Sequence, residues 1–194
     1  MRVVVGIDPA VSTGETSNET GLVVVAKGQD GHGYVFCDGS GKFSPHGWAE
    51  RAKWLKNQYH ADAYVIEANQ GGDMCEATLR TVDRVGKIIR VHASHGKMTR
   101  AEPVAALYEQ RRIHHVDPHG DAFRTLESQM CEFVPGATAS PDRLDAAVWG
   151  LTELFLGDEQ GWNLTAQTMR EWDRANALMG YTPERLAALR RWPW

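Results

Sequence analysis

The sequence predicts an α/β fold built on a mixed β-sheet with helices on both of its faces. Three β-branched runs open the chain, and helical and strand patterns alternate after them. Strands that follow one another directly form antiparallel neighbours, whereas strands separated by helices pair in parallel. The predicted order is therefore β-β-β-α-β-α-β-α-β-α-α, with an antiparallel three-strand side and a parallel side.

The individual elements follow from local residue patterns. The β-branched residues from Val3 to Ile7 indicate a strand that is buried on both faces, and Pro9 ends it. Further strands are predicted at residues 21–26, 33–37, 63–66, 87–92 and 112–116. Amphipathic helices are predicted at residues 45–59, 70–85 and 100–110.

The last helix of the core has the clearest limits. Ser140 is a suitable N-cap, Pro141 suits the first helical position, and Gly157 suits the C-terminal stop. An apolar stripe at helical spacing comprises Leu144, Val148, Leu151 and Phe155. Beyond residue 157 the composition changes and tryptophans become frequent. We therefore predict a core domain of residues 1–157 and a Trp-rich helical appendage of residues 158–194.

Composition and charge limit the class of protein. A chain of 194 residues with 42% hydrophobic content can bury one good core. No apolar run approaches the roughly 18 residues of a membrane span, and no signal-peptide pattern is present, so we expect a cytoplasmic protein without a membrane partner. The spacing of Cys37, Cys75 and Cys131 favours free thiols over disulfides or a structural zinc site. A net charge of −4 argues against coating nucleic acid through positive charge alone.

Acidic residues stand where two buried strands are predicted to end. Asp8 follows the first strand, and Glu67 follows the fourth strand just before a glycine-containing turn. Asp142 and Asp145 are three residues apart and share one face at the start of the last helix. Because sites in α/β proteins assemble at the carboxyl ends of strands, we expect these carboxylates to converge. Considered one at a time, each acid has an ordinary alternative explanation. Asp8 could initiate an Asx turn, and Asp142 could be an acid favoured by the dipole of its helix.

This set of acids and this order of elements resemble the ribonuclease H-like nuclease superfamily. Within it, the chain resembles the nuclease domain of the large terminase subunit of tailed bacteriophages, through "GIDPA", "SNETGLVVVA", "VIEANQGGDM", "KMTRAEPVAALYEQRRIHHV" and "SPDRLDAAVWGLTEL". The resemblance covers about residues 1–157. In that family the domain follows an ATPase motor and cuts concatemeric viral DNA during packaging. No G-x-x-x-x-G-K-[ST] motif occurs in this sequence, so we expect a nuclease domain without its motor.

The resemblance implies an activity and a cofactor. The activity is that of a two-metal-ion endodeoxyribonuclease, a hydrolase of double-stranded DNA in the cytoplasm of a host cell. The cofactor is two Mg²⁺ or Mn²⁺ ions, since hard divalent cations take oxygen ligands. Asp8 would bridge the ions, Glu67 and Asp145 would each complete one coordination shell, and Asp142 would be an outer or alternate ligand. The implied partners are the ATPase motor, the small terminase subunit and the portal protein.

Four basic residues are candidate contacts to the DNA backbone. Lys97 and Arg100 precede a predicted helix, and the resemblance favours a role in gripping phosphates over that of ordinary solvated charges. Arg111 and Arg112 belong to a basic run that either lines the DNA groove or forms a common surface turn.

Two other functions fit parts of the pattern. A Holliday-junction resolvase of the RuvC type shares the Asp, Glu and D-x-x-D arrangement and a similar length, but the stretches "EANQGGDM" and "RAEPVAALYEQ" favour a terminase. A catalytically silent module would instead dock a portal or motor through the Trp-rich tail. Retention of all the acids listed above argues against a silent module.

Overall fold

The computed structural model describes residues 1–9, 19–67, 72–91, 97–117, 120–133 and 141–157. These residues form one mixed sheet in the order β5-β4-β1-β2-β3-β6. The strands are β1 (Arg2–Asp8), β2 (Gly21–Lys27), β3 (Gly33–Asp38), β4 (Ala63–Glu67), β5 (Ile88–Val91) and β6 (Ile113–His115). The pairs β1–β2 and β2–β3 are antiparallel, and the other neighbouring pairs are parallel. The predicted antiparallel and parallel sides of the sheet are therefore confirmed.

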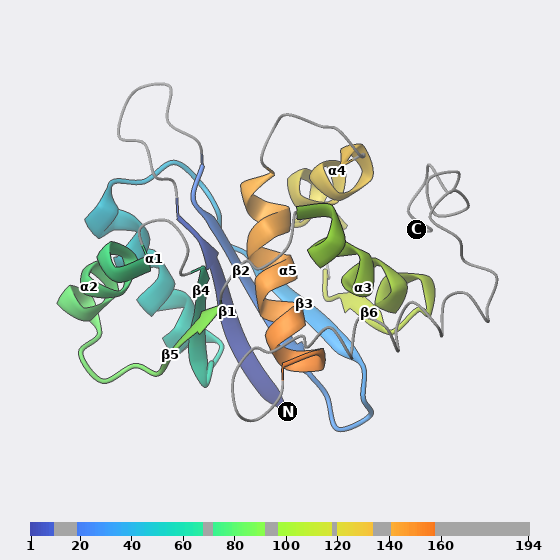
Figure 1. Cartoon of the computed structure of the whole chain (residues 1–194), viewed down its shortest axis with the longest axis horizontal. Coiled ribbons are helices and arrows are strands. Elements are labelled where there is room, and N and C mark those ends of the chain that lie inside the picture. The colour runs from blue at the N-terminus through green and yellow to red at the C-terminus, as the bar shows by residue number, and fades with distance from the viewer. Residues whose placement is uncertain (10–18, 68–71, 92–96, 118–119, 134–140, 158–194) are drawn as a thin grey trace.

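Helices cover both faces of the sheet. They are α1 (Pro45–Gln58), α2 (Gly72–Val82), α3 (Lys97–Glu109), α4 (Arg124–Glu132) and α5 (Asp142–Phe155). Figure 1 shows α1 and α2 on one side of the sheet and α3, α4 and α5 on the other. In β1, Val3 and Val5 pack in the layer with α1 and α2, whereas Val4 packs in the layer with α5. Since successive side chains of a strand point to opposite faces, β1 is buried on both sides, as predicted.

Helix α5 is buried around its whole circumference. Every residue from Leu144 to Leu154 is buried, because α5 lies between β1 and β2 on one side and α3 and α4 on the other. The predicted apolar stripe is buried except at Phe155, which is half-buried. The sequence pattern predicted burial along one stripe of the helix, whereas the structure buries all sides of it. A periodic pattern cannot show that further helices cover the opposite side.

Glycines allow α5 to lie unusually close to the sheet. A Cβ atom at Gly6 would lie 2.0 Å from the carbonyl oxygen of Ala146, and one at Gly21 would lie 2.0 Å from that of Asp142. Neither distance is sterically possible, so no larger residue fits at these positions without a shift of the backbone. The start of α5 is thereby held directly over the end of β1 and the beginning of β2.

The first turn of α5 is capped by a different helix. The N-cap is Pro141, one residue later than predicted, and the predicted cap Ser140 lies outside the described residues. The backbone N–H groups of Arg143 and Leu144 donate to Oε1 of Gln129 on α4, at 3.1 and 3.3 Å. A tertiary contact therefore satisfies amide groups that a local cap usually serves.

Most element limits differ from the predicted ones by a few residues. Helix α3 begins at residue 97 rather than 100, so that Pro103 lies inside it. Strands β5 and β6 are each shorter than predicted. Helix α1 begins as predicted, with Ser44 as its N-cap. The predicted appendage of residues 158–194 lies outside the described residues.

Two further findings concern the chain as a whole. Its cysteines, Cys37, Cys75 and Cys131, form no disulfide in the described part of the structure. Among the helices that the structure describes, none combines the length and the apolar character that crossing a membrane requires.

We expect Gly6→Ala to destabilise the fold by about 3 kcal/mol or more, because the added methyl group would overlap a backbone oxygen of a fully buried helix. Gly47→Ala is the matched control. Its Cβ atom would lie 3.1 Å from Ser44 Oγ, in the first turn of α1, and would otherwise make ordinary contacts with the side chain of Phe43. It should change stability by less than about 1 kcal/mol. Urea unfolding of both variants measures the difference, and equal stabilities would contradict the proposed close contact.

Candidate active site

Asp8 and Glu67 lie at the carboxyl ends of neighbouring parallel strands. Asp8 is the last residue of β1, Glu67 is the last residue of β4, and the residues just before them are paired in the sheet. Alternation places both side chains on the face that α5 covers, because Val4 and Val65 belong to that layer. The two strand ends that the sequence predicted as carriers of carboxylates are therefore adjacent.

Asp142 and Asp145 come to the same corner of the fold from α5. Gly21 is paired with Asp8 in the sheet, and the same glycine lies against the backbone of Asp142. Asp142 is half-buried, and Asp145, one turn further on, is only 7% exposed. The structure thus brings together the elements that carry all the predicted acids. Among the described side chains, however, no group of three or more His, Cys, Asp or Glu residues is arranged to hold a metal ion.

The thiol of Cys75 lies within the electrostatic field of this acidic corner. Cys75 is buried on α2, beneath the opposite face of the sheet. Its burial, reinforced by the negative charges of Asp8 and Glu67, raises the pKa of the thiol from 9.0 to about 11. Both carboxylates act on the same thiol, so their fields overlap at the ends of β1 and β4.

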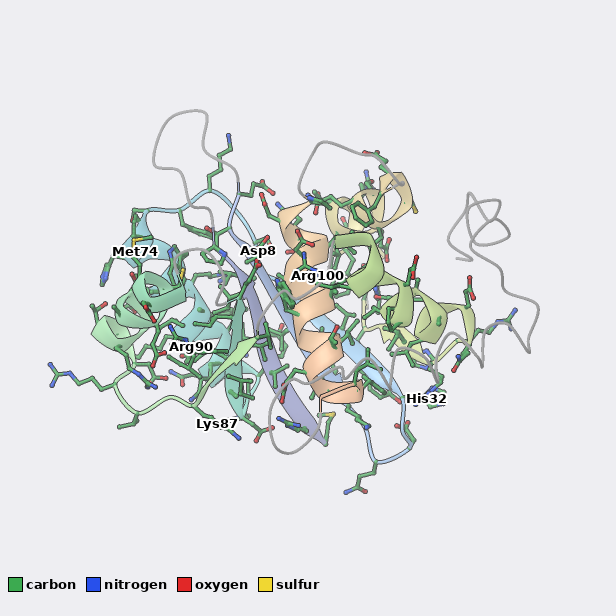
Figure 2. The ribbon with its side chains drawn as sticks, in the orientation of Figure 1. Asp8, His32, Met74, Lys87, Arg90 and Arg100 are labelled. Carbon is green, nitrogen blue, oxygen red and sulfur yellow. The ribbon has the colours of Figure 1, made fainter. Side chains whose placement is uncertain are left out.

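A buried arginine accompanies the acids. Arg100 of α3 is 8% exposed, and its Nη1 atom lies 3.9 Å from Oε1 of Glu67. Its guanidinium group lies over the ring of Trp149 on α5, 4.2 Å from the ring centroid. Figure 2 shows Asp8 at the end of β1 and Arg100 extending from α3 toward α5. Lys97, which was predicted to act with Arg100, begins α3, but its side chain lies outside the described part of the structure.

Arg143 is a residue of this corner that the sequence analysis missed. Its Nη1 lies 2.6 Å from Oδ2 of Asp38, and its Nε lies 2.9 Å from Oε2 of Glu19. The two ion pairs connect the start of α5 to the end of β3 and to the segment before β2. Their partners are more than 100 positions away in the sequence, so no local spacing could have predicted them.

Arg111 and Arg112 lie at the opposite end of the sheet from Asp8. Because β2 and β3 are antiparallel, the Gly33 end of β3 lies away from the end of β1, and Gly33 is paired with Ile113 just after the two arginines. Arg111 is exposed in a left-handed turn with φ 55°. Arg112 donates a hydrogen bond to the carbonyl oxygen of Gly31 at 3.0 Å. The structure therefore does not bring these arginines to the acidic corner.

The strand order, the helices on both faces and the acids at the ends of β1 and β4 define a ribonuclease H-like fold. The sequence matches the family described as the terminase RNaseH-like domain over residues 5–154. The chain belongs to this family, and it is thus a domain of the ribonuclease H-like nuclease superfamily. The fold and the family predicted from the sequence are both confirmed.

Several solved structures are similar to the chain. The yeast mitochondrial Holliday junction resolvase Ydc2 has a TM-score of 0.47 and 13% identity, with 76% of each chain covered. Thermus thermophilus RuvC has a TM-score of 0.43 and 18% identity, with 79% of this chain and 93% of that chain covered. The same protein in complex with a Holliday junction substrate has a TM-score of 0.40 and 17% identity, with the same coverage. No curated protein sequence matches the chain.

The raised pKa of Cys75 predicts slow alkylation below pH 9. With a pKa of about 11, the thiol should be only about 0.1% ionised at pH 8, and the thiolate is the reactive form. Asp8→Asn should shift the pH midpoint of its alkylation downward, because one of the charges that raise the pKa is removed. Mass spectrometry of iodoacetamide-treated, metal-free protein measures this midpoint, with the exposed Cys131 as the internal reference. An unchanged midpoint in Asp8→Asn would argue against proximity of Asp8 to the thiol.

Proposed function

We propose that this chain is a metal-dependent endonuclease that cleaves double-stranded viral DNA concatemers during genome packaging, as the nuclease part of a large terminase. The observation that carries the proposal is the position of Asp8 and Glu67 at adjacent strand ends beneath the start of α5, which bears Asp142 and Asp145. Membership of the terminase RNaseH-like family supports the same conclusion.

The chemistry of this corner fits divalent metal ions. Its predicted ligands are carboxylates only, and hard cations such as Mg²⁺ and Mn²⁺ prefer oxygen ligands. The corner also holds a cation already, since Glu67 pairs with the buried guanidinium of Arg100. In our proposal Asp8, Glu67 and Asp145 would hold the ions, and Asp142 would be an outer or alternate ligand. Bound there, two divalent ions would supply an activated water and neutralise the departing 3′ oxygen.

The protein's own contribution is rigid placement of the carboxylates. Asp8 and Glu67 stand on paired strands, and Asp145 stands on a helix that is buried on all sides. Sites mounted on such elements are held more precisely than sites on loops. The substrate would be bound through its phosphates, which carry no sequence information.

Recruitment of DNA would depend on other components. With a net charge of −4, the chain has little general attraction for a polyanion. We propose that a terminase ATPase motor, a small terminase subunit and a portal protein bring the DNA to the site.

Cleavage of plasmid DNA should require Mg²⁺ or Mn²⁺ and should stop in excess EDTA. Asp8→Asn and Asp145→Asn should each lower the rate by more than about 100-fold, because even outer-shell partners of metal ligands contribute 10–100-fold. Both variants should unfold at the wild-type temperature or above it in metal-free buffer, since clustered carboxylates repel one another. Asp30→Asn is the matched control, because Asp30 is an exposed residue of the β2–β3 turn. Cleavage in EDTA, or wild-type activity of either site variant, would refute the proposed site.

The isolated protein should cut linear duplex DNA with little sequence preference, and its binding should weaken steeply with salt. Nothing in the sequence resembles an element that reads base edges in a groove. Sequencing of the ends produced from a long random duplex tests this expectation. A four-way junction of equal length is the comparison substrate. A sharp consensus at the cut sites would contradict the expectation, and a strong preference for the junction would favour a resolvase over a terminase.

A further inference from the structure

Arg100 is an unusual residue, because it is a buried cation whose set of partners is incomplete among the residues that the structure describes. Among the described lysines and arginines it alone is buried, at 8% exposure. Its Nη1 atom makes no hydrogen bond within the described part of the chain. The nearby carboxylate oxygen of Glu67, at 3.9 Å, is beyond hydrogen-bonding distance. Burying a charge costs free energy unless it is paired, so this arrangement requires an explanation.

Arg143 shows how this chain pairs an arginine that has a structural role. Its guanidinium makes close ion pairs with Asp38 and Glu19, at 2.6 and 2.9 Å, and so it joins three segments. Within the part of the chain that the structure describes, Arg100 makes no comparably close contact with a carboxylate, although it lies beside a corner that carries several acids. Its charge is therefore compensated by a longer contact, with Glu67 at 3.9 Å.

Contacts with α5 place the guanidinium on the side of the helix that carries an acid. Arg100 lies over the ring of Trp149. Trp149 follows Asp145 by four residues, and residues at this spacing share one face of a helix. The guanidinium is consequently held between the end of β4, where Glu67 stands, and the face of α5 that bears Asp145. This is the region to which our proposed function assigns divalent ions.

We propose that Arg100 is an internal counter-cation, which compensates the acidic corner in the metal-free protein and competes with divalent ions for Glu67. This inference rests on the proposed function, since it assumes that Glu67 is a metal ligand. Arg100 is thus a positioning residue that acts through Glu67. It stabilises the clustered carboxylates when metal is absent and lowers the affinity of the corner for metal. The nuclease then becomes loaded only at metal concentrations high enough to displace the guanidinium from Glu67.

The first test is the Mn²⁺ affinity of the whole chain, measured by isothermal titration calorimetry. Arg100→Gln should bind Mn²⁺ more tightly by on the order of tenfold, because unit charges a few ångströms apart interact appreciably even when they are well screened. Arg100→Lys keeps the charge and should stay within about threefold of the wild type. The matched control is Arg51→Gln, which removes an arginine that lies over Trp54 on the other face of the sheet. It should leave the affinity unchanged.

The second test uses the metal-free protein and needs no activity. Thermal unfolding in EDTA is compared for Glu67→Gln, Arg100→Gln and the double variant. Each single variant leaves one charge uncompensated. The melting temperature of the double variant should therefore fall by less than the sum of the decreases in the two single variants. Additive losses would overturn the inference, because they would show that the two side chains do not interact.

The outcomes separate the inference from the proposed function. Wild-type protein that binds Mn²⁺ and cleaves DNA, together with equal or weaker Mn²⁺ binding by Arg100→Gln, would overturn the inference alone. Wild-type protein that binds no Mn²⁺ would overturn both.

Discussion

The backbone contact between α5 and the first two strands is the constraint on which the rest of the structure depends. Gly6 and Gly21 have no side chains, and the carbonyl oxygens of Ala146 and Asp142 occupy the space where a Cβ atom would lie. Interiors packed this closely transmit small displacements instead of absorbing them. The position of α5 relative to the sheet is therefore set by backbone against backbone, and α3 and α4 pack on the other side of the helix.

The same contact explains how residues distant in the sequence reach one corner. Asp8 is paired with Gly21 in the sheet, and Gly21 lies against the first residue of α5, so the end of β1 and the start of α5 meet there. Glu67 arrives through the parallel pairing of β4 with β1. Asp142 is half-buried and Asp145 is buried, and both stand in the first turn of α5, where the helix dipole favours negative charge. Further along, the same helix is almost entirely apolar.

Local patterns predicted the sheet and the positions of the acids well, because both depend on periodicity. The continuous β-branched run indicated that β1 is buried on both faces, and the strand ends placed Asp8 and Glu67 together. What the sequence could not predict depends on partners that are far away in the chain. Gln129 caps α5 from another helix, and Arg143 pairs with Asp38 of β3. Arg100 was predicted as a phosphate contact on a loop, whereas burial against Trp149 is a property of the tertiary structure.

The two arginines of this corner supply positive charge beside carboxylates that different segments bring together. Like charges that are brought together raise the free energy of the folded state, and this cost must be offset within the protein. Arg143 offsets the charges of Asp38 and Glu19 through close contacts that hold the surrounding segments. Arg100 has a looser contact, with Glu67 at 3.9 Å. If Glu67 binds a metal ion, as we propose, this loose pair would leave its carboxylate more able to accept the ion than a close pair would.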